Sequence, residues 1–487
     1  MAKYILPRIS DMIFLSLFIS VILLGPRTFN LDGDLGRHIT IGSHILNSRS
    51  IPTQDIFSHT LFGEPLTPHE WLSQLIFALA HKGLSLGGPV LVTAILITVT
   101  FVLVYYDSRQ RSTMPFLSLG MTILAAAASS LHWLARPHAF TFLYLAVWIY
   151  LLENIQRGKN VPAWILGLIM LLWANTHGAF IAGFAAWGAY TAGHILESLI
   201  QKQWREKELK TWLRIGLLSF IATLFNPHGI RLWMTSFGFI GNTYLVSHTQ
   251  EYQSINFHTP GSLPFLLMIF LSILALSLKQ HRLPASHALL LAGWTIMGLY
   301  SARNIPLYVI AAAPILTETL LNSISKSRWM AVESKLLKID RSVRGALWPL
   351  LCVGLAIILL STKPLQAYDR YDPSVFPVNA VNWLIENPQE GRIFNHFPWG
   401  GYLLYRTWPD QLVFIDGQTD FYGEALTREY EQVISLSNKW DSVLEKYQIS
   451  IVIMPTGSAL ETTLLQQDDW LIIYQDDTGT ILKKDAE

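Results

Sequence analysis

The sequence predicts a polytopic α-helical membrane protein that ends in a soluble α/β domain. Of its 487 residues, 51% are hydrophobic and only 14% are charged, whereas a soluble domain carries about 25% charged residues. About eleven apolar runs, each near the length that a bilayer span needs, divide the first part of the chain. The composition then becomes that of a soluble protein. We therefore expect a transmembrane domain over residues 1–362, with a first outer loop at 27–82, and a soluble domain over 363–487.

The first apolar run, at 12–24, follows Lys3 and Arg8. A cleaved signal peptide is the alternative, but Gly25-Pro26-Arg27 lacks a small-x-small cleavage site, so we interpret the run as a transmembrane anchor. The further runs lie at about 86–105, 114–132, 138–152, 162–176, 178–198, 213–225, 263–278, 287–301, 304–321 and 346–361.

Loop charge predicts the orientation. With a cytoplasmic N-terminus, the inside loops hold sixteen of the 35 Lys and Arg residues, and the outside loops hold about seven, which is the positive-inside pattern. An odd number of spans then puts the C-terminal domain outside the plasma membrane. The net charge of +1 suggests no nucleic-acid partner. The inside loops are 107–113, 153–161, 200–211, 279–284 and 322–344.

Four short polar motifs stand at the outer ends of apolar runs. They carry histidine, asparagine and arginine, whereas the inner loops have plain Lys, Arg and Glu character. Helix capping and turn formation alone are the alternative for each motif. We expect all four to converge on the face that receives the first loop. They are Arg136-Pro137-His138, Asn175-Thr176-His177-Gly178, Asn226-Pro227-His228-Gly229 with Arg231, and Ser301-Ala302-Arg303-Asn304.

The stretch 31–71 between the first two runs is strongly polar, so it must sit in water or line a wet cavity. Asp34, Arg37 and His38 follow helical spacing opposite an apolar stripe, which predicts a helix lying flat on the membrane with its polar side up. Asp32 is equally explained as a helix cap. A second amphipathic helix begins near His69 and Glu70. The carboxylate of Glu70 is also explained by a favourable interaction with the dipole at the N-terminus of this helix.

These residues resemble the GT-C glycosyltransferases, multi-spanning enzymes that use polyprenyl-phosphate sugars as donors. The similarity is greatest to the protein mannosyltransferase, aminoarabinose transferase and RgtA-like branch. It rests on an acidic residue after the first span, two interface helices in the first outer loop and a soluble C-terminal domain. The matching segments are Asp34-Leu-Gly-Arg37-His38, Ser48-Arg-Ser-Ile51-Pro52 and Thr67-Pro68-His69-Glu70.

The resemblance implies a catalytic aspartate at Asp34. This chain has Asp32-Gly33-Asp34 where the family often has Asp-Glu, so the choice between the two aspartates stays open. The resemblance also allows family members that use a metal and members that do not. The sequence therefore does not decide whether this protein binds a divalent cation.

The implied reaction is the attack of an acceptor hydroxyl on the anomeric carbon of a lipid-linked sugar, with phosphate leaving. A carboxylate can take the proton of the acceptor, and basic groups can stabilise the charge on the phosphate. The catalytic candidates are Asp34, Asp32 and Glu70. The candidates for binding the substrates are Arg37, His38, Asp55, His69, Arg136, His138, Asn175, His177, His228, Arg231 and Arg303.

We expect the partners to be a lipid-linked sugar donor, the membrane, and a glycan, lipid or protein acceptor. The alternatives are an oligosaccharyltransferase- or glycan-ligase-like enzyme and a non-enzymatic lipid or polysaccharide transporter. A transporter would place polar residues at mid-bilayer and often shows two related halves. Here the polar motifs cluster at the outer ends, which favours an enzyme.

The C-terminal domain should alternate strands and helices. Its segment 416–422, Asp-Gly-Gln-Thr-Asp-Phe-Tyr, combines acids and aromatic rings that suit a sugar acceptor, although a turn with core aromatics is the alternative. The expected elements are helices at 378–386, from 399, at 425–436 and at 440–447, and strands at 392–397, 412–416, 449–454, 470–474 and 479–483.

Overall fold

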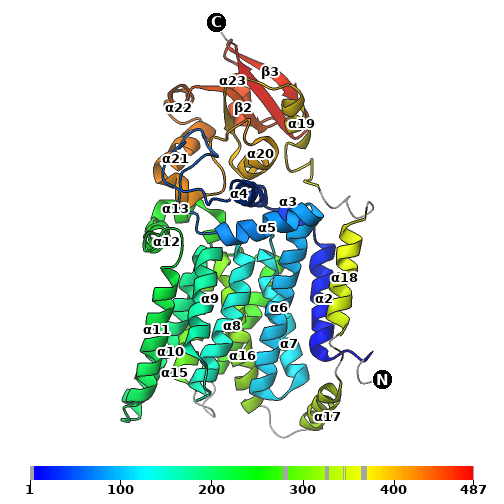
Figure 1. The fold of residues 1–487 in the computed structure, drawn as a ribbon, viewed down its shortest axis with the longest axis vertical. Helices are drawn as coiled ribbons and strands as arrows, with labels where there is room; N and C mark the ends of the chain where they lie inside the picture. Colours follow the sequence, from blue (N-terminus) through cyan, green and yellow to red (C-terminus); the bar gives the residue numbers. More distant parts are fainter. Residues whose placement is uncertain are drawn as a thin grey trace.

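The computed structural model describes residues 5–277, 283–323, 328–343, 345, 347–362 and 370–485. A helical bundle stands beneath the C-terminal domain, and two short helices of the first loop lie between them (Figure 1). The basic residues Lys279, Arg282, Lys326 and Arg344 of the expected inside loops lie outside the described residues, as does the expected domain boundary at 362/363.

All the predicted apolar runs are helical in the structure. Because each run is apolar along most of its length, its backbone groups are satisfied within the helix, which is the stable state in lipid. The helices are α2 (Ile9–Leu23), α6 (Gly87–Ser112), α7 (Pro115–Ser129), α8 (His138–Gln156), α9 (Ala163–Thr176), α10 (Ile181–Ile200), α11 (Glu206–Thr223), α14 (Leu263–Ser277), α15 (Ala285–Tyr300), α16 (Ile305–Ser323) and α18 (Leu347–Leu360).

Fewer helices than the expected eleven meet the length and composition of a span. In the described part of the chain six do, or up to seven if α18 and its neighbour α17 (Arg328–Ser342), bent by 67°, form one broken span. The helices α2, α9 and α15 are apolar but have 14–16 residues. At a rise of 1.5 Å per residue they reach about 21–24 Å, less than the hydrocarbon core of about 30 Å. α11 is long enough but opens with charged residues.

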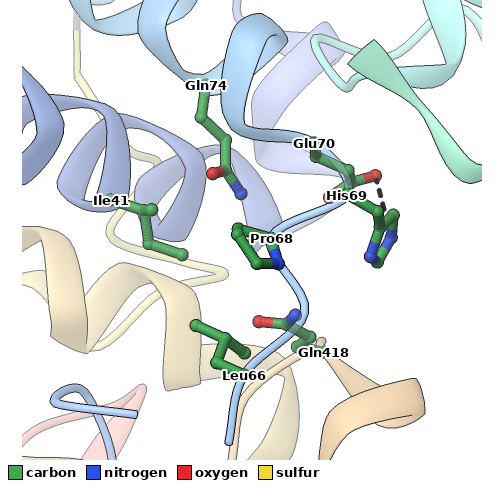
Figure 2. Close-up of a pocket in the computed structure, with 7 residues that line it drawn as sticks. All are labelled: Ile41, Leu66, Pro68, His69, Glu70, Gln74 and Gln418. Atoms are coloured by element: carbon green, nitrogen blue, oxygen red, sulfur yellow. Dashed lines mark ion pairs between the residues drawn. The ribbon is translucent and has the colours of Figure 1, made fainter. Parts of the chain in front are cut away.

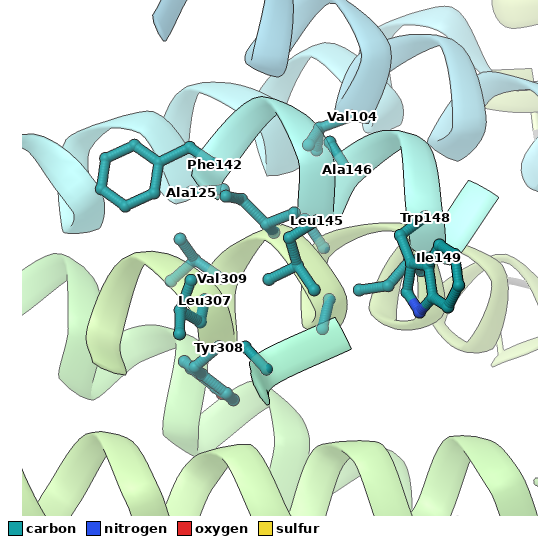
Figure 3. Close-up of a cluster of buried hydrophobic side chains, with 14 of the residues drawn as sticks. Val104, Ala125, Phe142, Leu145, Ala146, Trp148, Ile149, Leu307, Tyr308 and Val309 are labelled. Atoms are coloured by element: carbon teal, nitrogen blue, oxygen red, sulfur yellow. The ribbon is translucent and has the colours of Figure 1, made fainter. Parts of the chain in front are cut away.

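The bundle core is formed by large side chains packed between α8, α9, α10 and α16, with Trp148, Trp173, Tyr190 and Tyr308 fully buried. Figure 3 shows part of this cluster around α8 and α16. The indole of Trp148 donates to the carbonyl of Gly183 at 2.8 Å, so the buried polar atom is satisfied. Such packing, rather than a hydrophobic drive, holds helices together in lipid.

The first loop forms α3 (Arg27–Asn30), α4 (Asp34–Ser48) and α5 (Trp71–Leu84). The two expected interface helices are present, but the exposed polar side expected for α4 is wrong. Residues 34–42 are buried, because α4 lies between α5 and α20 (Gly400–Thr407) of the C-terminal domain. Gly36 allows this approach, since a Cβ there would lie 2.3 Å from the carbonyl oxygen of Gly401.

Two further helices, α12 (Arg231–Gly241) and α13 (Thr243–His248), follow α11 at the end of the bundle that faces the domain. α13 contacts α21 (Thr419–Ile434) of the C-terminal domain.

The C-terminal domain is a four-stranded sheet with helices packed against it. The strand order is β1-β2-β4-β3, with β1 and β2 parallel and the other pairs antiparallel. The remaining elements are α19 (Val378–Glu386), β1 (Arg392–Asn395), α22 (Trp440–Lys446), β2 (Ile449–Pro455), α23 (Ala459–Leu464), β3 (Trp470–Gln475) and β4 (Gly479–Lys484).

The strand expected at 412–416 is wrong. This apolar segment is extended and buried, but it pairs with the first loop instead of the sheet: the amide of Val413 donates to Phe57, and His59 donates to Val413. The side chain of Asn395 accepts from the amide of Phe414 at 2.9 Å. The first loop and the C-terminal domain are therefore joined by backbone as well as side chains.

Candidate active site

Arg136 is the centre of a half-buried charge cluster at the end of the bundle that faces the C-terminal domain. It lies in the turn before α8, and its guanidinium forms ion pairs with three carboxylates. Its Nε lies 2.9 Å from Asp32 Oδ2, and its two terminal nitrogens contact Asp34 and Glu251. A fixed guanidinium fork can serve several carboxylates in this way. The cluster joins the end of the first span, the start of α4 and the loop after α13.

Arg303 provides a second guanidinium beside the first. It begins the span of α16 and lies 3.5 Å from Glu251 Oε2. It donates to the hydroxyl of Tyr252 at 3.0 Å and lies 3.2 Å from Nε2 of His177. Two arginines from separate outer ends therefore meet at Glu251, and a histidine from a third outer end contacts one of them.

Glu70, at the N-cap of α5, links this cluster to α4. One carboxylate oxygen lies 3.4 Å from Arg37 and 3.7 Å from His38. The other lies 3.9 Å from His177 and 4.0 Å from His69. Glu70 thus connects the two loop helices with the end of α9.

The C-terminal domain contributes the turn before α21. Arg37 donates to Gln418 Oε1 at 2.7 Å and lies 3.8 Å from Asp416 Oδ1. His69 lies 3.6 Å from Asp420. The acidic and aromatic segment 416–422 therefore reaches the charge cluster.

Gly417 sits directly against Asp34. A Cβ at this position would lie 1.8 Å from Asp34 Oδ1, so only glycine fits here. The carboxylate of Asp34 is thereby held between the domain turn and Arg136.

Burial and neighbouring charges shift the pKa values of these groups in different directions. Burial, reinforced by Asp34 and opposed by Arg136, raises the pKa of Asp32. Burial also acts on Glu251, but Arg136 and Arg303 outweigh it and hold its pKa at about 2. Burial and then Arg37 lower the pKa of His38 well below its usual value. Groups with pKa values pushed apart are the arrangement that acid–base chemistry needs.

A small pocket opens between the first loop and the C-terminal domain. Glu70, His69 and Gln418 face it, together with Gln74 and an apolar wall of the first loop (Figure 2). Nε2 of Gln74 lies 3.4 Å from His38 Nδ1. The pocket is lined by Ile41, Leu66, Pro68, His69, Glu70, Gln74 and Gln418.

Nine of the candidate residues meet in this cluster. They come from the first loop and from three of the four outer motifs, so the predicted convergence holds for three motifs and not for the one at 226–229. They are Asp32, Asp34, Arg37, His38, His69, Glu70, Arg136, His177 and Arg303.

Two candidates serve the local fold instead. Asp55 is buried and accepts from the amide of Phe57 at 3.0 Å and from Ser58 Oγ at 2.5 Å, so it closes a turn. Asn175 accepts from the indole of Trp71 at 2.8 Å and donates to two backbone carbonyls. It ties α5 to the end of α9, and its contacts involve no charged group.

The last three candidates lie beside or away from the cluster. His138 follows Arg136 closely, but its Nε2 lies 2.7 Å from the carbonyl oxygen of His132. His228 is half-buried, and its Nε2 has no hydrogen-bond partner among the described residues. Arg231 is exposed at the start of α12. Substrate binding by these three residues stays a prediction.

Glu251 and Tyr252 are site residues that the sequence analysis missed. They lie in the loop between α13 and α14, which is rich in polar residues and has no periodic pattern. Position is the signal that could have identified Glu251, because it is an acid in an outer loop and that loop must lie beside the other outer motifs.

The described residues contain no group of three or more His, Cys, Asp and Glu side chains that could hold a metal ion. Asp32, Asp34 and Glu251 each contact Arg136, so a guanidinium stands where their oxygens converge. We therefore derive no step through a metal.

No protein-family model matches the chain, and no curated protein matches it. Solved structures do match. Among them are structures of the Archaeoglobus fulgidus oligosaccharyltransferase. The structure tethered to an acceptor peptide with the NVT sequon is 13% identical, with a TM-score of 0.57. That of AglB with an inhibitory peptide and a dolichol-phosphate is 14% identical, with a TM-score of 0.56. Each match covers 91% of this chain and 69% of the other.

A third match is ArnT from Cupriavidus metallidurans bound to undecaprenyl phosphate. It is 14% identical, has a TM-score of 0.50 and covers 96% of this chain and 97% of that chain. At these identities the likeness concerns the fold. The resemblance predicted from the first loop is confirmed at that level: this chain has the fold of the GT-C membrane glycosyltransferases.

Proposed function

We propose that the protein is a membrane glycosyltransferase that moves a sugar from a polyprenyl-phosphate-linked donor to an acceptor hydroxyl on the extracytoplasmic side. The observation that carries the proposal is the meeting of three arginines, four carboxylates and three histidines at one end of the bundle, around Arg136 and Glu70. The relatives in fold support it, because ArnT was solved with undecaprenyl phosphate and AglB with a dolichol-phosphate.

The chemistry requires a proton acceptor beside cations. Asp34 is our general base, since it is held by Arg136 and Gly417 at the boundary between the bundle and the C-terminal domain. Asp32 is the alternative base. Its raised pKa brings it closer to neutral pH, where a base is most effective.

The phosphate that leaves carries negative charge that must be stabilised. Arg303 and Arg136 are the groups for this task, and His177 lies within reach of Arg303. Fixed guanidinium donors in a water-poor site stabilise developing charge without reorganisation. Three carboxylates around Arg136 would repel an approaching phosphate, so Arg303, at the edge of the cluster, is the first point of contact in this proposal.

An oligosaccharyltransferase-like reaction is the second candidate. The observation that favours it is the contact of the C-terminal turn with the cluster, through Asp416 and Gln418, because a domain that reaches the reacting groups can present an acceptor. The structure of the archaeal relative with a tethered acceptor peptide fits this alternative.

The test is a transfer assay with purified protein and a radiolabelled sugar on polyprenyl phosphate. We expect transfer in the wild type and none with Asp34→Asn, whose fold should remain intact. Full activity of Asp34→Asn removes Asp34 from the mechanism and leaves Asp32 to be tested in the same way.

The orientation is tested separately by a tag added after residue 487. We expect membrane-impermeant reagents to reach the tag in intact cells. Protection of the tag until the cells are opened would place the charge cluster on the cytoplasmic side and remove the argument for a lipid-linked donor.

A further inference from the structure

A second cavity lies apart from the charge cluster. It has a volume of about 400 Å³, in the range of small-ligand pockets. It opens between the start of α6, the segment that leads into α19, and α20. Its lining is Leu86, Arg370, Tyr371, Pro373, Val378, Asn379, Asn382, Tyr402, Tyr405 and Arg406.

The cavity carries two guanidinium groups in its lining, those of Arg370 and Arg406. Arg406 donates to Tyr402 Oη at 3.2 Å and to Asn382 Oδ1 at 3.0 Å, both uncharged groups. Neither Arg406 nor Arg370 is in an ion pair with any described carboxylate. The acid closest in sequence, Asp372, accepts from Ser374, and these bonds together with the charge of Arg370 lower its pKa, so Asp372 partly offsets Arg370. Two guanidinium groups on one cavity, of which Arg406 has no ion pair with a described carboxylate, favour an anionic ligand.

The remaining lining suits a saccharide. Tyr371, Tyr402 and Tyr405 form a contiguous aromatic wall, with ring centroids 4.8 Å apart for the first pair and 5.9 Å for Tyr371 and Tyr405. Aromatic faces pack on the apolar faces of sugars, and the amides of Asn379 and Asn382 offer both donors and acceptors for hydroxyl groups. A phospholipid headgroup would use the arginines but has no need of these amides.

Tyr371 connects the cavity with the charge cluster. Its side chain is 4% exposed, and its hydroxyl has no hydrogen-bond partner among the described residues. Burial raises its pKa, and the charges of Asp32 and Asp34 act in the same direction, so the hydroxyl lies within reach of their field. The next residue, Asp372, donates its amide to Asn30 at 2.9 Å, which fixes this segment to α3.

We propose that this cavity binds an acidic saccharide unit, bearing a carboxylate or phosphate, of the acceptor. Its role as an acceptor subsite rests on the proposed function, whereas the binding of an acidic sugar does not. The guanidinium groups of Arg406 and Arg370 hold the acid, and the tyrosine wall carries the ring. The saccharide then extends past Tyr371 toward Asp32 and Asp34.

The test measures the binding of tetragalacturonate, with maltotetraose as the neutral match, to purified full-length protein in nanodiscs of zwitterionic lipid. We expect tetragalacturonate to bind more tightly than maltotetraose, and Arg406→Gln to weaken its binding by about tenfold or more. Asn382→Asp, which places a carboxylate beside Arg406 without shortening a side chain, should weaken it as well. Lys484→Gln, which removes a charge from the surface pair with Asp469, should leave it unchanged.

Equal binding of the two oligosaccharides, or unchanged binding in both Arg406→Gln and Asn382→Asp, overturns the proposal. So does displacement of tetragalacturonate by nanodiscs that contain phosphatidylglycerol, because the cavity is then a headgroup site. Repeating the measurement with Asp34→Asn separates the two proposals. If no sugar transfer is found in any preparation but Arg406-dependent binding persists, the cavity assignment stands and the proposed function fails.

Discussion

The bundle holds a charge cluster at each end, and the two are built differently: the one away from the C-terminal domain is buried and the one beside it is half-buried. The far-end cluster lies at the ends of spans away from the C-terminal domain. There Arg111 pairs with Asp107 at 2.7 Å and lies 3.4 Å from Glu153. Glu153 also accepts from Arg157 at 2.6 Å and from Tyr190 at 3.0 Å. Its members stand on membrane helices, except Arg157, which directly follows α8.

The domain-end cluster around Arg136 draws instead on loops, helix ends and the C-terminal domain. It borders a pocket, which is the difference between the two clusters, since each holds one buried guanidinium nitrogen without a hydrogen-bond partner among the described residues, Arg37 Nε here and Arg111 Nη1 at the far end. Three carboxylates share Arg136, so negative charge is in excess there. A charge network enclosed between helices stabilises a fold, whereas one that borders a pocket can contact a ligand. We therefore infer that the far-end cluster stabilises the fold and that the domain-end cluster takes part in the reaction.

The largest expected effect is on transfer by Asp34→Asn. Loss of the general base should lower the rate of sugar transfer by about 10²–10⁴-fold. The thermal stability should change little, because Arg136 keeps its contacts with Asp32 and Glu251. Transfer rate and melting temperature on the same preparation check both statements. A destabilised but fully active variant would reverse the assignment of the two clusters.

Glu153→Gln should show the opposite pattern. Removing this charge leaves Arg111 and Arg157 with one carboxylate fewer in a buried site, which we expect to cost about 3–5 kcal/mol of stability. Denaturation in detergent measures the loss. Transfer per folded molecule should be unchanged, and a loss of transfer with an unchanged melting curve would assign chemistry to the far end.

The contrast also shows what the sequence could predict. Apolar runs are local signals, so the helices were predicted from them, as were Asp34, Arg37 and Glu70 from the polar first loop. Glu251 was not predicted, because its role arises only from a contact with Arg136, which is 115 residues away in the sequence. The segment 412–416 has the composition of a strand, but the Asn395 side chain and the first loop take up its backbone bonds.

A pH effect should distinguish the domain turn from the rest of the site. Burial, opposed by Arg37, raises the pKa of Asp416 to about 6, whereas an unfolded Asp has about 3.9. The folded state therefore binds this proton more tightly, and the stabilisation is complete below pH 4 and lost as the pH rises through 6. The shift corresponds to about 3 kcal/mol.

Asp416→Asn removes this titration. We expect the stability of the wild type relative to Asp416→Asn to fall between pH 4 and pH 7, as measured by melting curves across that range. Parallel pH profiles of the two proteins would mean that Asp416 is solvated in the folded protein.

The smallest expected effect is that of Arg303→Lys. The charge remains, but the planar fork that contacts Glu251, Tyr252 and His177 is lost. We expect transfer to fall about tenfold, which corresponds to about 1.4 kcal/mol. Measuring the transfer rate of the variant at varied donor concentration checks this prediction. If the rate depends on donor concentration as it does in the wild type, Arg303 has no part in phosphate binding.

The account rests on the claim that the domain-end cluster receives the phosphate of a lipid-linked sugar. Photo-crosslinking with a polyprenyl phosphate that carries a diazirine beside the phosphate, followed by peptide mapping, tests it most directly. We predict labelled peptides that contain Arg136, His177, Glu251 or Arg303, and loss of the label with Arg303→Gln. Labelling confined to peptides around Arg111 and Arg157, or labelling that Arg303→Gln leaves unchanged, would contradict the account.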